Sequence, residues 1–182
     1  MGRRSVDVKK QFIPHPMQLF LVGTYDRDHQ VNMGMFCWLS FCWDEELCIT
    51  VCMDGEKATK DNIKETGMFS ACLVTEGLLP VANKIAASSG GRKQEILEEA
   101  AVHPGLALDV PVLSDSPYCY ELSVKKVIPL AGSDLFVCRI ADTTVPEEYI
   151  QNGVYSLTEM DPVLVSQKEY LKVTTKEECG LL

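Results

Sequence analysis

Short apolar runs separated by polar turns recur along the chain, and this pattern predicts a protein made mainly of β-strands. The turn from Asp26 to His29 joins the first two runs as a hairpin. Seven runs have the length and apolar content of strands: Gln18 to Tyr25, Gln30 to Leu39, Leu47 to Met53, Met68 to Thr75, Tyr118 to Lys125, Leu135 to Ala141 and Val163 to Gln167. Hairpin-linked strands are antiparallel, so we expect a closed, mainly β barrel with helical additions rather than a doubly wound parallel sheet.

Helical signals are fewer. The first expected helix runs from about Thr59 to Thr66, with Thr59 as a good N-cap and Gly67 at the C′ position. Apolar residues from Leu78 to Ala86 repeat at helical spacing, and a second short helix follows around Ile96 to Ala101. The segment from His103 to Ser116 is rich in Pro, Gly and Asp, and we interpret it as a loop.

The chain has 182 residues, 46% hydrophobic content and a formal net charge of −9. These values fit one globular domain over residues 1–182, with a core from about 14 to 170. The basic residues form no stripe, which argues against nucleic-acid binding. No apolar run approaches the roughly 20 residues that span a bilayer, and the N-terminus is too polar for a signal peptide. We therefore expect no membrane association and a cytoplasmic location.

The chain has eight cysteines, which are Cys37, Cys42, Cys48, Cys52, Cys72, Cys119, Cys138 and Cys179. Most of them lie among apolar residues of expected strands. No Cys-x-x-Cys pair occurs and the three histidines lie elsewhere, so neither zinc nor an iron–sulfur cluster is expected. A disulfide framework is not expected without a secretion signal. We interpret the cysteines as reduced thiols that serve as small apolar core residues.

A candidate anion site lies at the start of the first expected helix. A helix N-terminus offers unpaired backbone N–H groups and the positive end of the helix dipole, which together suit a phosphate. Lys57 and Lys60 place positive charge beside Thr59. The alternative is an ordinary capped surface helix, which these residues alone favour somewhat because caps are common.

The run from Asn32 to Trp43 is a second candidate, because it is apolar on both faces and ends with small polar atoms at Ser40 and Cys42. As one strand it could line a flat aromatic ligand, with backbone amides at the edge of the ligand and Trp38 over one face. The alternative is a central barrel strand with Trp38 in the core, and the periodicity alone prefers it.

The run from Ser88 to Lys93 is a third candidate, because it combines hydroxyls, two glycines and two cations. These residues fit a mobile loop that contacts an anion. A flexible connection between two helices explains them equally well. Other chemistry has little support, since no Gly-x-Ser-x-Gly, Walker or Gly-x-Gly-x-x-Gly motif occurs and the histidines are isolated. We expect no catalytic side chain.

Taken in order, several short motifs resemble the flavin reductase-like family of FMN-binding split barrels, and especially its flavoredoxin-like branch. The resemblance covers the chain from about Pro14 to Tyr170. The matching stretches are Leu21 to Asp26, Asn32 to Trp38 with Ser40, Ala58 to Ile63 with Gly67 and Phe69, Ser89-Gly90 through Lys93, Val110 to Leu113, Ser116-Pro117 and Glu121.

The resemblance implies a six-stranded antiparallel Greek-key barrel and a homodimer that holds FMN noncovalently near the subunit interface. Carried over by position, the ring would lie along Asn32, Met33, Cys37, Trp38, Leu39 and Ser40, with Cys42 nearby. The phosphate would be held by Lys57, Ala58 and Thr59 with support from Asn62, and Ser89 and Lys93 would reach the phosphate or the ribityl oxygens from a loop. The chain departs from the family pattern in three places: at Glu45-Glu46, in the short run at Gly91-Arg92, and in the cysteines near the expected ring site.

Family members reduce flavin with NAD(P)H or carry electrons on bound FMN. The resemblance therefore implies an NAD(P)H-dependent flavin reductase. One alternative is an electron-transfer protein that exchanges electrons with a protein partner. Another is a split barrel that has lost flavin and binds a different ligand or only associates with itself. The sequence carries no motif that distinguishes NADH from NADPH.

Overall fold

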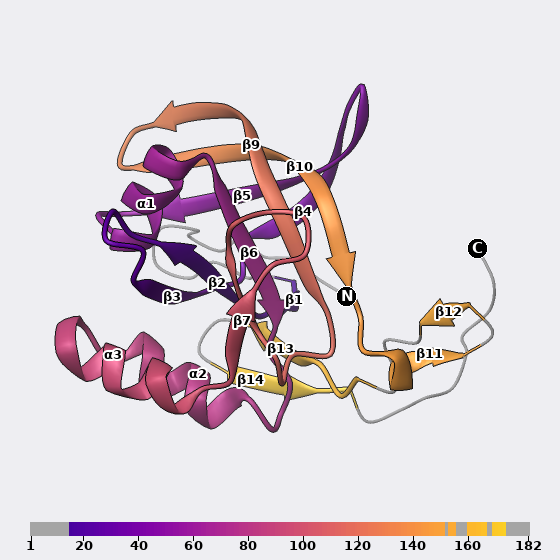
Figure 1. Ribbon diagram of the computed structural model, residues 1–182. Coiled ribbons are helices and arrows are strands. Elements are labelled where there is room, and N and C mark those ends of the chain that lie inside the picture. Colours follow the sequence, from indigo (N-terminus) through magenta and orange to yellow (C-terminus); the bar gives the residue numbers. More distant parts are fainter. Residues whose placement is uncertain (1–14, 152, 156–159, 167–168, 174–182) are drawn as a thin grey trace, which may run out of the picture.

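The computed structural model describes residues 15–151, 153–155, 160–166 and 169–173, most of them in strands (Figure 1). The elements, in chain order, are β1 (Met17–Gln18), β2 (Phe20–Tyr25), β3 (Val31–Phe36), β4 (Leu39–Asp44), β5 (Glu46–Asp54), α1 (Ala58–Thr66), β6 (Met68–Leu73), α2 (Leu79–Ala86), α3 (Gly90–Glu99), β7 (Val102–Pro104), β8 (Pro111–Leu113), β9 (Cys119–Leu130), β10 (Ser133–Thr144), a 3₁₀ turn (Glu147–Tyr149), β11 (Ile150–Gln151), β12 (Val154–Tyr155), β13 (Val163–Ser166) and β14 (Glu169–Lys172).

Seven strands form one antiparallel sheet in the order β3-β2-β6-β9-β10-β5-β4. Its two edge strands are consecutive in the chain, joined only by Cys37 and Trp38. Three residue steps span roughly 10 Å at most, so the sheet must curl until its edges approach at this corner. There the Cys52 N–H donates to the Trp38 carbonyl at 3.0 Å. The predicted antiparallel barrel is confirmed, with a seven-stranded sheet where six strands were expected.

The run from Asn32 to Trp43 is therefore not one strand, and the expected hairpin partner of β2 stops three residues early. β3 ends at Phe36 and pairs with β2, whereas β4 begins at Leu39 and pairs with β5 at the other edge of the sheet. The chain changes partner at the corner without a break in its apolar character. An unbroken apolar run carries no signal of such a change, which is why the sequence pattern missed it.

Side chains on one face of the sheet fill the barrel. Alternation along β2 directs Phe20 and Val22 into this interior core, where they meet Phe69 of β6 and Phe136 of β10. α1 contributes Ile63, which is fully buried in the same core. The helix is thus attached to the barrel through its apolar face, which fixes the position of its N-terminus.

The opposite face of the same sheet buries a second core beneath α2, α3 and the β7–β8 hairpin. Leu21 of β2 packs there with Ile85 of α2 and Leu97 of α3. Figure 1 shows α2 and α3 side by side along the lower side of the molecule, below β3. Since β2 is covered on both faces, all six of its residues are buried.

α1 ends as predicted. Gly67 follows its last residue at φ 71°, in the left-handed conformation that glycine adopts without strain, and its N–H bonds to the Ile63 carbonyl at 2.9 Å. The predicted helix over α2 is also confirmed. The expected loop from His103 to Ser116 is wrong in part, since β7 and β8 pair within it. Their terminal prolines are tolerated because the two strands form a separate short ribbon.

No helix among the described residues is both long and apolar enough to cross a membrane. Residues 1–14 lie outside the described part of the chain, as does Cys179.

Candidate functional site

The N-terminus of α1 has no side-chain cap. Lys57 is the N-cap residue, with extended backbone at φ −149° and ψ 132°, and makes no capping bond. The first bond within the helix runs from the Asp61 N–H to the Lys57 carbonyl at 3.1 Å, so the N–H groups of residues 58–60 have no partner inside the helix. Lys57 and Ala58 are exposed. N–H groups at a helix N-terminus, beside a positively charged side chain, suit an anion.

Thr59 does not cap the helix as predicted, because its side chain is buried and turned toward the sheet. The Asn32 amide Nδ2 donates to Thr59 Oγ1 at 2.9 Å and to Thr24 Oγ1 at 3.1 Å. The Asn62 amide Nδ2 also donates to Thr24 Oγ1, at 3.0 Å. Three predicted site residues, Asn32, Thr59 and Asn62, thus meet in one hydrogen-bonded cluster. The cluster ties the first two turns of α1 to β2 and β3.

Lys60 lies beside Thr59 in sequence but not at the predicted anion site. Its buried side chain places Nζ 3.4 Å from Asp134 Oδ2, and Lys64 Nζ lies 2.7 Å from the same oxygen. The hydrogen bond from Lys64, together with one from Lys60, holds the pKa of Asp134 below its ordinary value. Of the two lysines expected to serve the anion, only Lys57 lies on the surface.

The outer edge of β3 receives two side chains from α3. Lys93 Nζ donates to the Met33 carbonyl at 3.1 Å, and Gln94 Nε2 donates to the Val31 carbonyl at 2.9 Å. Burial lowers the pKa of Lys93. The predicted mobile loop is wrong here, because residues 90–93 form the first turn of α3. Ser89 is the exposed N-cap residue of that helix and makes no side-chain capping bond.

The corner between β3 and β4 carries Cys37 and Trp38. The Trp38 side chain is 46% exposed, so the alternative that placed it in the core is wrong. Cys37 is half-buried, and this burial raises the pKa of its thiol. The half-buried Cys37 thiol and the exposed Trp38 indole therefore come directly after β3, the edge strand that Lys93 contacts.

The predicted residues on β4 lie around the corner. Leu39 and Ser40 line a small pocket of about 170 Å³ together with Phe20 and Tyr120. Cys42 lies further along β4, where it faces Cys48 of β5 in the ladder. Hydrogen bonds thus join Asn32, Thr59 and Asn62 through Thr24 at the start of α1. A separate bond joins Lys93 to Met33 at the outer edge of β3. The β4 residues belong to a neighbouring part of the barrel.

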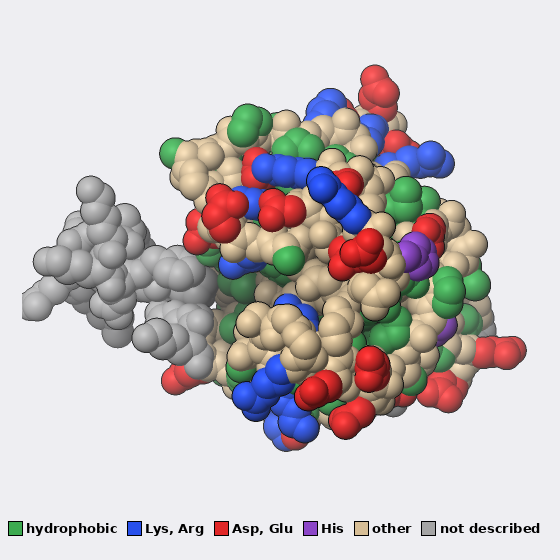
Figure 2. Space-filling view, turned by 60° about the vertical axis from the view of Figure 1, so that its left-hand side comes forward, with side chains coloured by type: hydrophobic (Ala, Val, Ile, Leu, Met, Phe, Trp, Pro, Cys, Tyr) green, Lys and Arg blue, Asp and Glu red, His purple; other side chains and the backbone are tan. Residues whose placement is uncertain are grey.

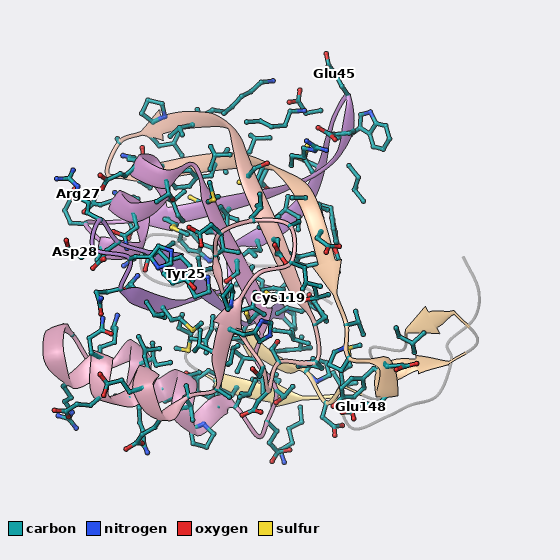
Figure 3. The ribbon with its side chains drawn as sticks, in the orientation of Figure 1. Tyr25, Arg27, Asp28, Glu45, Cys119 and Glu148 are labelled. Atoms are coloured by element: carbon teal, nitrogen blue, oxygen red, sulfur yellow. The ribbon has the colours of Figure 1, made fainter. Side chains whose placement is uncertain are left out.

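Figure 2 views the side of the molecule on which α1, the β2–β3 turn and α3 come forward. Acidic and basic side chains are mixed on this face, and the surface is hollowed between its upper and lower parts. The His29 ring stacks on Tyr25 at the base of the β2–β3 turn, with ring centroids 3.9 Å apart. Figure 3 shows Tyr25, Arg27 and Asp28 together at this end of the hairpin.

Three residues that position the site were not singled out from sequence. Thr24 accepts from both asparagines, and Gln94 binds the β3 edge beside Lys93. Gly34 allows α1 to approach β3, because a Cβ there would lie 2.8 Å from Thr59 Oγ1. Only the glycine carried a signal, since a glycine inside a strand marks a close approach of another group.

An antiparallel barrel whose sheet edges meet at one corner has the architecture of a split barrel, and the N-terminus of α1 and Lys93 both lie against its edge strand β3. The chain belongs to the family described as Flavin reductase like domain, which matches residues 13–172. The family predicted from sequence is thereby confirmed, and membership supports a flavin-related function. A search among curated protein sequences found no match.

Solved structures share this fold over nearly the whole chain. Flavoredoxin of Desulfovibrio vulgaris (Miyazaki F) is 24% identical, with 96% of each chain covered and a TM-score of 0.85. Flavoredoxin from Methanosarcina acetivorans is 19% identical, with 98% of this chain and 96% of that chain covered and a TM-score of 0.87. Nitrilotriacetate monooxygenase component B from Bacillus cereus is 17% identical, with 98% and 99% covered and a TM-score of 0.85.

Proposed function

We propose that this protein binds FMN noncovalently, with the phosphate at the N-terminus of α1. The observation that carries the proposal is the missing side-chain cap on that helix, which leaves the N–H groups of residues 58–60 without partners inside the helix. Lys57 is the exposed cation beside them. Asn32 and Asn62 hold the helix start against the sheet through Thr59 and Thr24.

The outer edge of β3 suits the ring of the same ligand. Lys93 and Gln94 bond to carbonyls of β3 that face away from β2, and in an antiparallel ladder the N–H groups of those residues face the same way. The outward-facing N–H groups of this edge can donate hydrogen bonds to the polar atoms at the edge of a flavin ring. The exposed indole of Trp38 offers an aromatic face at the end of the edge.

Bound flavin would supply the redox chemistry, and the chain would supply binding and orientation. The Lys93 ammonium lies at the edge of β3, where it would stabilise negative charge that develops on a reduced ring. We infer that NADH or NADPH would be the reductant of the bound flavin, and that the residues of the site would bind and orient the ring without supplying an acid or a base. This reading makes the protein an NAD(P)H-dependent flavin reductase.

The second candidate is an electron carrier that exchanges electrons with a protein partner. It is favoured by the likeness of fold to two flavoredoxins. A carrier would hold the flavin at the same site but would react slowly with nicotinamide nucleotides. A split barrel without flavin is the third reading, and it requires that added FMN does not bind.

A homodimer with flavin near the interface is part of the proposal. Apolar side chains are exposed on the β4–β5 hairpin, with Phe41 and Trp43 on β4 and Leu47 on β5. Figure 3 shows Glu45 at the tip of this hairpin, which projects from the body of the protein. Exposed apolar groups on an edge strand favour association with a second copy. The cytoplasmic location stays a prediction.

The test is the visible absorption spectrum of freshly purified protein, followed by anaerobic addition of NADH or NADPH. Flavin bands that bleach rapidly with either nucleotide would support the reductase. Bands that bleach only with dithionite would instead support the electron carrier. A colourless protein that does not bind added FMN, measured by fluorescence titration, would overturn both.

A further inference from the structure

Two cysteines outside the proposed flavin site stand side by side in the second core. Cys72 of β6 and Cys119 of β9 face each other in the antiparallel ladder, and their Sγ atoms are 3.0 Å apart. A disulfide bond is about 2.05 Å long, so the two sulfurs need to move only about 1 Å to bond. Figure 3 shows Cys119 near the centre of the molecule.

The backbone at this pair suits a cross-link. Leu73 donates its N–H to the Tyr118 carbonyl at 3.0 Å, which makes the next pair of the ladder a hydrogen-bonded one. Cys72 and Cys119 therefore occupy a pair without mutual backbone bonds, where facing Cα atoms lie about 4.5 Å apart. That separation falls within the range of roughly 4.4–6.8 Å found for disulfides.

A cavity leads to the pair from the surface. It has a volume of about 220 Å³ and is lined by Cys119, Leu113 and Thr144, with exposed His103 and Leu106 at its margin. One water occupies about 30 Å³ of liquid volume, so a molecule the size of a hydroperoxide fits. Cys119 lines this cavity, whereas Cys72 is not among its lining residues.

We propose that Cys72 and Cys119 form a two-electron redox site at which a small hydroperoxide produces an intrachain disulfide. With hydrogen peroxide, the Cys119 sulfur attacks one oxygen and the O–O bond breaks. That oxygen stays on Cys119 as a sulfenic acid, and the other takes up the thiol proton and leaves as water. Cys72 sulfur then displaces the hydroxyl from Cys119, so the S–S bond forms and a second water leaves. Two thiols are oxidised by two electrons, and the peroxide is reduced.

The surroundings of Cys72 suit the second step. Its Sγ accepts a hydrogen bond from the Leu113 N–H at 3.4 Å. The hydrogen bond with Cys119, together with this one, lowers the pKa of Cys72, whereas the same contact raises the pKa of Cys119. Both thiols are buried, and Cys72 loses its proton more readily than Cys119, which favours attack by Cys72 on the oxidised sulfur. The raised pKa of Cys119 makes its own attack on the peroxide the slow step.

The cross-link would close a loop that contains residues 73–118, which include α2, α3 and the β7–β8 hairpin. The strands β6 and β9 are already neighbours in the sheet, so the barrel itself need not change. The disulfide would instead join the two ends of segment 73–118, which covers the second core. We therefore expect a higher midpoint of thermal unfolding in the oxidised protein, because a closed loop lowers the entropy of the unfolded chain.

The experiment treats the reduced full-length protein with hydrogen peroxide and then blocks remaining thiols with N-ethylmaleimide in denaturant. Peptide mass mapping without reductant should show Cys72 joined to Cys119 in most chains, reversed by dithiothreitol. Cys138 is the matched control within the same chain, because it is also buried but faces Ile49 and Val124 in the ladder and not a second cysteine. It should stay fully alkylated while the cross-link forms.

Two variants make the result specific. In Cys119→Ser the cross-link should vanish and Cys72 should stay a free thiol, whereas in Cys138→Ser the cross-link should form as in the original protein. The proposal is overturned if both thiols remain alkylated after peroxide, if Cys119 proceeds to sulfinic acid without bonding to Cys72, or if a Cys42–Cys48 cross-link forms in its place. None of these readouts depends on flavin.

Discussion

Gly34 of β3 lies directly against Thr59 of α1, so closely that a Cβ at position 34 would stand 2.8 Å from Thr59 Oγ1. This contact brings the N-terminus of the helix to the edge strand of the sheet. The hydrogen bond from Asn32 to Thr59 at 2.9 Å then holds it there. The proposed phosphate and ring subsites are adjacent because of this approach.

We predict that Gly34→Ala destabilises the protein and weakens FMN binding. The added methyl would also meet the Phe36 ring at 2.8 Å, so either the ring or the start of α1 must shift. Overpacking of this kind costs roughly 1–3 kcal/mol. Urea unfolding and an FMN titration measure the two effects. Gly77→Ala is the control, since its nearest atom is 3.8 Å away, and an equal loss in that variant would contradict the explanation.

Reversal of the charge at Lys57 should weaken FMN binding with little effect on stability. The side chain is exposed, and a negative charge there would repel the phosphate at the helix N-terminus. Helix-terminal charges contribute about 1 kcal/mol, so Lys57→Glu should raise the Kd about fivefold or more. Fluorescence titration provides the measurement. The exposed Lys84 of α2 supplies the control as Lys84→Glu, and unchanged affinity in Lys57→Glu would rule out this phosphate position.

The buried carboxylate of Glu121 fastens the loop between β7 and β8. It accepts three backbone N–H bonds, from Leu106 at 2.7 Å, Ala107 at 2.9 Å and Leu108 at 2.7 Å. Glu121→Gln would replace an acceptor with an amide NH₂ that faces these donors. We expect a loss of about 2–3 kcal/mol in the free energy of unfolding. The exposed Glu98→Gln is the control, and equal stability of the two variants in urea would refute the role.

Asp134 makes part of the stability of the protein depend on pH. Its pKa is lowered in the folded state by the hydrogen bonds from Lys64 and Lys60. A lowered carboxyl pKa contributes stability above the unfolded pKa, about 3.9, and this contribution is lost as the pH falls through the folded pKa. Asp134→Asn should therefore be less stable than the original protein at pH 7, and the difference should shrink below about pH 4.

Urea unfolding at a series of pH values checks this dependence. Asp115→Asn serves as the control, because Asp115 is exposed and should show no such trend. A stability difference between Asp134→Asn and the original protein that stays constant from pH 7 to pH 3 would show that the ion pairs are not its source.

The proposed homodimer predicts that Trp43→Glu shifts the protein toward monomer. Trp43 is 76% exposed on β4, and a charge at this position would have to be buried without a partner in an apolar interface. Sedimentation equilibrium measures the change. Leu130→Glu is the control at an exposed apolar position of β9, on a different hairpin. A protein that sediments as a monomer before any substitution would refute the dimer.

Much of the fold was predictable because local patterns decide it. The apolar runs of β2, β5 and β6 are bounded by turns, and Gly67 ends α1 where its φ of 71° requires glycine. The change of partner at Cys37 and Trp38 was not predictable, since the apolar run continues across it. The side of the sheet to which Thr59 turns also depends on Gly34 and Asn32, which are distant in sequence.

The sequence by itself determined the barrel class, the first helix and the family, because strand periodicity, turn residues and the order of short motifs are local properties. Only the tertiary structure decided which groups meet. It paired Lys60 with Asp134 and not with the anion site, brought Lys93 to the Met33 carbonyl, and placed the sulfurs of Cys72 and Cys119 3.0 Å apart. Such contacts depend on how the sheet curls and how the helices pack on it, which no single stretch of sequence encodes.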